Sequence, residues 1–237
     1  ISGGWDLSTE TQTGQTWFRQ MHGTFNTRNG YGLYMTGKSY TNLDKLNFLR
    51  YNYGIYTNGS SNNTITSATC NSNSNYGIYY YNGCNNNTIT SATCNSNGSY
   101  GVYYNTNSNN NTITSATCNS NNYGIYTNGS NNNTIVSATC NSNVMYGISY
   151  SSSSSNTIYA LSTTGNTTAG IYSNTANNIC HFATIAESTK VAMGSAYYSD
   201  TRQYINNLGG FSYVYSNYAT ANSQNATAGG TGKEWKF

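Results

Sequence analysis

Charge is scarce in this 237-residue chain, and proline is absent. Asp, Glu, Lys and Arg make up 6% of the residues, against about 25% in a typical soluble domain. None of the four occurs from Tyr51 to Ala186, so the formal net charge of +3 comes from residues near the two ends. The chain therefore lacks the basic face that attracts nucleic acid, and we predict no nucleic-acid partner.

Long apolar runs are also missing. No stretch reaches the roughly 18 apolar residues that a membrane-spanning helix needs, so we predict no membrane span. The chain begins at Ile1 without a methionine, which indicates either a fragment boundary or a mature end left by removal of a signal peptide. We favour the second alternative and expect a secreted protein at the cell surface.

What the chain has instead is tyrosine, glycine and asparagine. Tyrosine occurs 25 times and glycine 24 times. Low hydrophobicity is typical of disordered chains, but those are usually also charged and poor in aromatic and β-branched residues. Here tyrosine, isoleucine and threonine recur at fixed steps, so the sequence predicts a polar but ordered β-structure.

The middle of the chain repeats one phrase four times. Asn62–Cys70 has the sequence NNTITSATC, which returns at Asn86–Cys94, at Asn110–Cys118 and, with one change, at Asn132–Cys140. A second phrase, Tyr-Gly-aliphatic, lies between the copies. Its glycines follow one another at steps of 22 to 24 residues, at Gly32, Gly54, Gly77, Gly101, Gly124, Gly147 and Gly170. Self-similarity at this period predicts a solenoid.

The residues of each period predict short β-strands. Thr, Ser, Asn and Gly disfavour helix. Three short strands and their corners fill one period, with one strand centred on Ile65, one ending at Cys70 and one around Ile78. Asn and Gly suit the corners because they tolerate left-handed backbone conformations. We therefore predict an all-β fold, a parallel β-helix of about eight coils.

Stacked coils place equivalent residues about 4.8 Å apart, so the repeat predicts columns of like side chains. Inward aliphatic columns begin at Leu33 and Ile65, and an outward tyrosine column begins at Tyr34. Asparagine columns follow the corners, where their amides can hydrogen-bond from coil to coil.

Two motifs link the chain to a known family. Tyr-Gly-Ile-Tyr at Tyr123–Tyr126, followed by Asn-Asn-Thr-Ile at Asn132–Ile135, resembles the NosD-type right-handed parallel β-helix repeat of archaeal and bacterial surface and periplasmic proteins. The resemblance covers about residues 23–198 and implies a right-handed helix. The composition and repeat style also resemble self-assembling sheath or filament proteins of archaeal cell surfaces.

Cysteine replaces the aliphatic residue that this family often has five positions after the first isoleucine. The resulting inward column contains Cys70, Cys94, Cys118 and Cys140. Neighbours in such a column are close enough for disulfides within the pairs 70–94 and 118–140, but they could equally be free thiols packed as small apolar groups. Cys84 in a corner and Cys180 in the Ile65 column are candidates for bonds between subunits. The spacing lacks the close cysteine pairs of a zinc site.

Asn-x-Ser/Thr triplets, the acceptors of N-glycosylation, recur with the repeat. They begin at Asn58, Asn62, Asn86, Asn97, Asn110, Asn128, Asn132, Asn166 and Asn225. A chain this rich in Asn, Ser and Thr also produces such triplets by chance, so the motif alone does not show glycans.

Carboxylates are missing where a β-helix enzyme would need them. Polysaccharide lyases and hydrolases use acidic residues for calcium binding or acid–base chemistry, and the regular coils have none. A site at the C-terminal end, built from Glu187, Lys190, Asp200 and Arg202, is an alternative, although these charges could simply cap the stack. We predict that the protein is not an enzyme and uses no cofactor or metal.

These observations favour a structural cell-surface protein that assembles with copies of itself into a filament, sheath or layer. Uncharged faces do not repel one another, and the strand edges at the ends of a β-helix can template pairing. We expect an N-terminal arm at 1–22, the β-helix at 23–198 and a C-terminal cap or arm at 199–237. A carbohydrate-binding adhesin is the main alternative. Ice binding through Thr64, Thr88, Thr112 and Thr134 is less favoured, because tyrosines are expected to share that surface.

Overall fold

The structure, a computed structural model, describes residues 30–175, 178–181 and 183–187. It also describes the backbone of short strands at 5–6, 11–12, 16–19, 191–193, 212–214 and 226–228. The predicted arms at 1–22 and 199–237 fall largely outside these residues, so their boundaries stay predictions. Lys190, Asp200, Arg202 and Asn225 also lie outside them.

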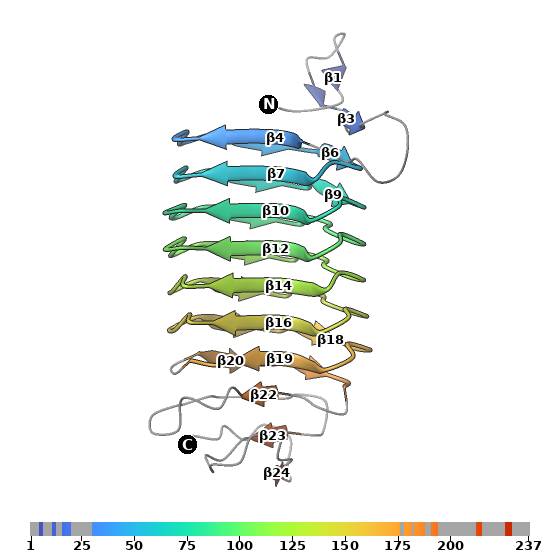
Figure 1. The fold of residues 1–237 in the computed structure, drawn as a ribbon, viewed down its shortest axis with the longest axis vertical. Helices are drawn as coiled ribbons and strands as arrows, with labels where there is room; N and C mark the ends of the chain where they lie inside the picture. Colours follow the sequence, from blue (N-terminus) through green and yellow to red (C-terminus); the bar gives the residue numbers. More distant parts are fainter. Residues whose placement is uncertain are drawn as a thin grey trace.

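The described chain is a parallel β-solenoid whose coils are stacked along one axis (Figure 1). One side of every coil belongs to an eight-stranded parallel sheet, which we call the tyrosine sheet. Its strands are β4 (Tyr31–Thr36), β7 (Tyr53–Asn58), β10 (Tyr76–Tyr81), β12 (Tyr100–Asn105), β14 (Tyr123–Asn128), β16 (Tyr146–Ser151), β19 (Ala169–Ser173) and β22 (Val191–Met193).

A second side forms a seven-stranded parallel sheet, which we call the threonine sheet. Its strands are β5 (Asn42–Asp44), β8 (Thr64–Thr66), β11 (Thr88–Thr90), β13 (Thr112–Thr114), β15 (Thr134–Val136), β17 (Thr157–Tyr159) and β20 (Ile179–His181). The stack therefore has about seven turns, close to the number of coils that the sequence predicted.

The third side is less regular. It contains β3 (Thr16–Arg19), β6 (Leu46–Leu49), β9 (Thr69–Asn71), β18 (Ser162–Thr163) and β21 (Thr184–Ile185). Between β9 and β18, only single parallel bridges link one coil to the next. Two antiparallel pairs complete the list: β1 (Trp5–Asp6) with β2 (Thr11–Gln12), and β23 (Ser212–Val214) with β24 (Ala226–Ala228).

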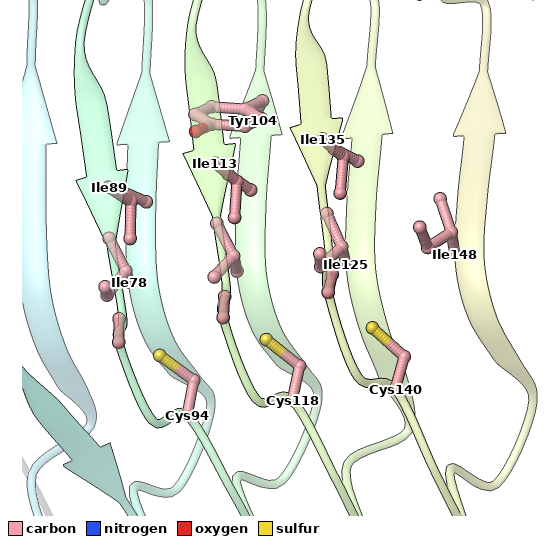
Figure 2. Packing of buried hydrophobic residues seen from close by; sticks show 14 of the residues in the cluster. Ile78, Ile89, Cys94, Tyr104, Ile113, Cys118, Ile125, Ile135, Cys140 and Ile148 are labelled. Carbon is pink, nitrogen blue, oxygen red and sulfur yellow. The ribbon is translucent and has the colours of Figure 1, made fainter. Parts of the chain in front are cut away.

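The core consists of the columns that the repeat predicted. Ile65 and its equivalents Ile89, Ile113 and Ile135 are at most 1% exposed, as is Ile55 of the other aliphatic column. Figure 2 shows Ile89, Ile113 and Ile135 of the first column together with Ile78, Ile125 and Ile148 of the other, near the cysteines Cys94, Cys118 and Cys140. Replacing one such isoleucine by alanine is expected to cost about 2–5 kcal/mol, because a core site left empty collapses only partly.

The corners have the backbone conformation that their sequence indicates. Ser67, Ser72 and Asn82 all have positive φ, near 55°. Small polar residues tolerate this left-handed region better than bulky ones do. The chain therefore turns at Thr66–Ser67, Asn71–Asn73 and Asn82–Gly83.

Two buried ladders of asparagine join the coils. The first contains Asn63, Asn87, Asn111, Asn133, Asn156 and Asn178, and the second contains Asn73, Asn97, Asn121, Asn143 and Asn166. In each ladder the side-chain oxygen of one asparagine accepts from the backbone N–H of its equivalent in the preceding coil, as Asn111 Oδ1 does from Asn87 N at 2.8 Å. Removing one such amide would leave buried N–H groups without acceptors, at a cost of about 1–3 kcal/mol each.

Glu187 ends the second ladder. Its carboxylate is buried, and it accepts from the Thr163 hydroxyl at 2.7 Å, from Asn166 N at 3.3 Å and from Asn166 Nδ2. In the ladder, the backbone N–H of each asparagine donates to the side-chain oxygen of the asparagine in the next coil toward the C-terminus. A carboxylate can accept such a hydrogen bond but cannot donate one. Glu187 therefore serves as a terminal acceptor, in agreement with the predicted capping role.

Within the part of the chain that is described, no helix is long and apolar enough to cross a bilayer.

Candidate functional site

A glycine in each strand of the tyrosine sheet decides which side chains face outward. A Cβ on Gly101 would lie 2.9 Å from Cys118 Cβ, so this position points inward like the following Val102. Two consecutive inward positions interrupt the ordinary alternation of a strand. As a result, the tyrosines before and after this pair, such as Tyr100 and Tyr103, share the outer surface, with ring centroids 4.6 Å apart.

The outer surface of the tyrosine sheet is therefore paved by two aromatic columns, which we call the tyrosine face. Its members are Tyr31, Tyr34, Tyr53, Tyr56, Tyr76, Tyr79, Tyr100, Tyr103, Tyr123, Tyr126, Tyr146 and Tyr172. The predicted outward column beginning at Tyr34 is confirmed by these contacts. The second column was not predicted from the sequence, because strict alternation from Ile78 would place Tyr76 inside.

The rings pack against each other along and across the strands. Tyr34 and Tyr56 stack with centroids 5.2 Å apart, and Tyr79 and Tyr103 with centroids 4.9 Å apart. Such pairs contribute about 0.5–1.5 kcal/mol beyond the area that they bury. The rows are therefore held in place from coil to coil, and they present a fixed surface of ring edges and hydroxyls.

Burial holds the hydroxyls of several tyrosines of this face in their neutral form, against the effect of hydrogen bonds. Asn105 Nδ2 donates to the Tyr79 hydroxyl at 3.0 Å. Burial, followed by the neighbouring tyrosines, raises the pKa of Tyr79 to about 12 even though this hydrogen bond lowers it. Burial is also the main cause that raises the pKa of Tyr56, Tyr100 and Tyr103 above the ordinary value. These four hydroxyls are thus uncharged at any physiological pH.

Threonines occupy a different surface from the tyrosines. Along the threonine sheet, Ile65 is buried while Thr64 and Thr66 face outward, in register with the equivalent pairs of the next coils. Among the described residues, the expected mixing of tyrosines with these threonines occurs at Tyr159 alone. The double row is complete in three coils only, since Val136 and Tyr159 follow in the second column.

The cysteine column lies in the core as predicted, and all its thiols are free. Cys94, Cys118 and Cys140 occupy successive coils, with their sulfur atoms pointing the same way (Figure 2), and Cys70 precedes them. In this structure the column consists of packed thiols, and the disulfides 70–94 and 118–140 stay a prediction. Hydrogen bonding with Cys118 and burial raise the pKa of Cys94 and Cys140, so these two thiols stay protonated, whereas the hydrogen bonds with Cys140 and Cys94 lower the pKa of Cys118 to about 5.

Cys84 and Cys180 are buried, which corrects their assignment as links between subunits. Cys84 occupies a corner position that serine takes in other coils: its backbone N–H donates to the Ser108 hydroxyl at 3.3 Å, and its sulfur accepts from Ser60 N at 3.4 Å. The corner side chain folds inward there. Burial raises the pKa of Cys180 to about 12. Neither sulfur is accessible to another copy of the chain.

Three further tyrosines, which the sequence analysis did not place, point into the core. Tyr80, Tyr104 and Tyr150 are at most 1% exposed, and their hydroxyls have no hydrogen-bond partner among the described residues. Tyr80 and Tyr104 stack with centroids 5.1 Å apart. They lie two positions after the inward aliphatic residue of their strands, where alternation could have identified them.

Glycosylation triplets are distributed over the fold unequally. Four are exposed at one corner, which connects the tyrosine sheet to the threonine sheet: Asn62, Asn86, Asn110 and Asn132. Asn58 and Asn128 end strands β7 and β14 and are half-buried. Asn97 and Asn166 belong to the second asparagine ladder and are buried.

Comparison with family models assigns the chain to a family. It belongs to the family described as periplasmic copper-binding protein (NosD), which matches residues 80–236. The pattern of a right handed beta helix region matches residues 21–118. The predicted NosD-type right-handed parallel β-helix is confirmed, and the family's periplasmic description agrees with an exported protein. The archaeal and sheath likenesses stay predictions, and no curated protein matches the chain significantly.

The described residues do not fit the copper that the family's name implies. No group of three or more His, Cys, Asp or Glu side chains converges among them. The cysteines form a line in the core, and the acids Asp44 and Glu187 belong to opposite ends of the stack. Copper sites gather imidazole, thiolate or thioether ligands around one point, an arrangement that this part of the chain lacks.

Solved structures match the fold at low identity. The periplasmic alginate epimerase AlgG has a TM-score of 0.60 and 18% identity, covering 69% of this chain and 46% of that chain. The A-module of the Azotobacter vinelandii mannuronan C-5 epimerase AlgE4 has a TM-score of 0.58 and 13% identity, covering 81% and 55%. Tailspike protein 2 from Escherichia coli O157:H7 bacteriophage CAB120 has a TM-score of 0.57 and 18% identity, covering 73% and 25%. The chain thus spans between a quarter and about half of these proteins, and the likeness shows a shared fold.

The prediction that the protein is not an enzyme is contradicted by these neighbours. Two are named as epimerases of alginate or mannuronan, and another tailspike structure is named as an enzymatically active domain. The absence of carboxylates argues against an acid–base site only on the long faces of the regular coils. The fold itself is one that carbohydrate-active enzymes use, so the exclusion of catalysis is withdrawn.

Proposed function

We propose that this protein is a structural component of an exported surface assembly, in which copies stack head to tail through the open strand edges of the solenoid. The observation that supports the proposal best is the sheet order. The tyrosine and threonine sheets end at β4 and β5 on the N-terminal side, and within the described chain neither strand has a partner beyond it.

Such edges favour continuation by another copy. An unpaired edge strand offers a row of N–H and C=O groups to a further strand. Every strand pair within the stack is parallel, so the C-terminal end of one copy presents strands in the orientation that β4 and β5 of the next would continue. The uncharged coils from Tyr51 to Ala186 add no long-range repulsion between copies.

The proposal is tested by the assembly state of the full chain. Material exported by the native cell, and purified chain at increasing concentration, should sediment as polymers. Electron microscopy should show fibres whose axial rise equals the length of one stack. Since charge pairs are not the cause, raising the ionic strength should not dissolve the polymers. A monodisperse monomer at all concentrations would refute the proposal.

A second candidate function is polysaccharide binding on the tyrosine face. Aromatic rings with polar rims are typical of surfaces that contact sugars, and twelve such rings form one continuous, uncharged array. The neighbours named as alginate and mannuronan epimerases support a carbohydrate ligand for this fold. An array that repeats with every coil suits an extended polymer better than a small sugar.

This candidate is tested by calorimetry with neutral and acidic polysaccharides. The double variant Tyr53→Ala and Tyr126→Ala removes half-buried rings from the face, while Thr66→Ala and Thr114→Ala make the same kind of truncation on the threonine sheet. Binding that the tyrosine pair weakens at least tenfold and the threonine pair leaves unchanged supports the assignment. Equal effects of the two variants, or no binding by the native chain, would exclude it.

A further inference from the structure

One corner of the solenoid repeats an exposed asparagine in four successive coils. We call Asn62, Asn86, Asn110 and Asn132 the glycan column. Backbone hydrogen bonds link their coils, with Asn62 N donating to Asn85 O and Asn86 N donating to Asn109 O. The corner lies where the tyrosine-sheet strands end in Figure 1, on the left-hand side of the stack.

The local backbone separates the two asparagines of each Asn-Asn-Thr motif. Asn62 has φ of 58° and is exposed, whereas the next residue, Asn63, is 2% exposed and forms part of the first ladder. Because its backbone is left-handed, Asn62 directs its side chain away from the stack, and Asn63 takes the position in the ladder. Among the described residues, the amides of the glycan column make no side-chain hydrogen bond, so their nitrogens are available.

The threonine that completes each motif is accessible as well. Thr64 and its equivalents Thr88, Thr112 and Thr134 face outward on the threonine sheet and are half-buried. An acceptor site needs both the asparagine and this hydroxyl residue. In the glycan column, both side chains of the motif are on the surface of the folded chain.

The other triplets differ in ways that the fold imposes. Asn97 Nδ2 donates to Asn121 Oδ1 at 3.1 Å, and Asn166 Nδ2 donates to Cys140 O at 2.8 Å. These amide nitrogens are buried and engaged in the ladder. A glycan placed there before folding would remove those hydrogen bonds and could not fit between coils about 4.8 Å apart.

Asn58 and Asn128 are intermediate cases. Both end strands of the tyrosine sheet and are half-buried. A hydrogen bond between the Asn128 side chain and Tyr103 lowers the pKa of that tyrosine against the stronger effect of burial. A glycan on Asn128 would break this contact at the rim of the tyrosine face.

We infer that the glycan column is the N-glycosylation site of this protein, and that the buried triplets at Asn97 and Asn166 are not used in the folded chain. The donor is a lipid-phosphate-linked oligosaccharide. The amide nitrogen bonds to the anomeric carbon of the first sugar, the bond from that carbon to the phosphate oxygen breaks, and the amide proton leaves with the phosphate. The sugars then project from one corner and leave the faces of both sheets free.

Glycopeptide mass spectrometry of the full chain, exported by a host that glycosylates Asn-x-Ser/Thr triplets, tests the inference. Trypsin has no site from Tyr51 to Ala186, so cleavage after aromatic residues is used, and electron-transfer fragmentation localises each sugar. Glycans are expected on glycan-column residues and not on Asn97 or Asn166. A folded chain that has a glycan at either buried site, or none in the column, would overturn the inference.

Matched variants separate the glycan column from the strand-end triplets. Replacing all four column asparagines by glutamine should abolish the mass added by glycans, while Asn58→Gln with Asn128→Gln should leave most of it. Circular dichroism confirms that each variant is folded. If the column variant keeps its glycan mass, or if the strand-end variant loses it, the assignment is wrong.

Discussion

Single glycine positions leave no room for a side chain where the coils meet. A Cβ on Gly101 would lie 2.5 Å from the carbonyl oxygen of Gly124 in the next coil, closer than any van der Waals contact allows. We predict that Gly101→Ala lowers the free energy of unfolding by about 3 kcal/mol through overpacking. Urea denaturation followed by circular dichroism measures the loss.

The matched control is Gly83→Ala, at a corner. A Cβ there meets no atom within 4 Å, and its φ of +77° is the only source of strain. A left-handed alanine costs about 1 kcal/mol. Equal losses in the two variants would contradict the role assigned to the glycine of the tyrosine sheet.

The buried hydroxyl of Tyr104 is a local weakness in the core. It is fully buried and has no hydrogen-bond partner among the described residues, and burying such a group costs about 1–3 kcal/mol. We predict that Tyr104→Phe leaves stability unchanged or raises it by about 1 kcal/mol. By contrast, Tyr79→Phe should lower stability by about 1 kcal/mol, because it removes the acceptor of the Asn105 hydrogen bond. Thermal unfolding compares the two, and a clear loss in Tyr104→Phe would show that its hydroxyl is bonded.

The direction of a side chain, inward or outward, was predictable wherever side chains alternate along a strand. Ile65 and Cys70 were placed inward from the sequence, and both are buried. Tyr76 was not placed outward, because Gly77 adds an inward position that alternation alone does not include. The sequence does contain a signal for this extra inward position, because a glycine precedes the aliphatic residue in every period. Cys84 was misplaced because the inward turn of its corner depends on the serines of adjacent coils.

At the scale of one sheet, ionisation of the tyrosine face makes the free energy of unfolding depend on pH in the alkaline range. Burial and neighbouring tyrosines hold the pKa of Tyr79 at about 12, and burial raises that of Tyr56, Tyr100 and Tyr103 further above the usual 10.0. Unfolded tyrosines ionise first, so above pH of about 10 the unfolded chain binds fewer protons than the native chain. The stability is complete below that pH and falls as the pH rises toward the folded-state pKa values.

We therefore predict a cooperative loss of structure in the alkaline range that coincides with the appearance of tyrosinate absorbance. Urea midpoints measured from pH 8 to 12 should be constant at first and then decline. The variant Tyr56→Phe and Tyr100→Phe removes two of the shifted groups, and its midpoints should decline less steeply. Tyrosinate absorbance that rises gradually near pH 10 without any loss of structure would contradict the raised pKa values.

Elements were easier to predict than surfaces. The strands around Ile65 and Ile78 are present in every regular coil, because a fixed period averages out the weak signal of each short strand. The separation of threonines from tyrosines was not predicted, since it depends on which strands share a sheet. That separation creates the two faces with different chemistry, the tyrosine face and the threonine sheet.

At the scale of the whole molecule, the parallel right-handed helix followed from repeat and family resemblance, while its ends did not. The stack has about seven turns, close to the number of coils that the period predicted. Residues at the ends have no repeat to constrain them. The proposed head-to-tail assembly depends on those ends, so the repeat predicts the fold of the stack but not the contacts between copies.

Charge placed at the open end of the stack should prevent assembly. Tyr34 and Thr36 are exposed on β4, the last strand of the tyrosine sheet on the N-terminal side. We predict that Tyr34→Lys with Thr36→Lys lowers polymer mass at least tenfold, because charged side chains on an edge strand oppose pairing by another copy. Sedimentation and electron microscopy at equal protein concentration measure the change.

The control places the same charges in a middle coil. Tyr126 and Asn128 occupy the equivalent positions of β14, four strands away from β4 in the sheet order. Tyr126→Lys with Asn128→Lys leaves the edge strand untouched, so polymers held end to end should persist. If the β14 variant dissolves the polymers and the β4 variant does not, copies associate through the tyrosine face side by side, and the head-to-tail arrangement is wrong.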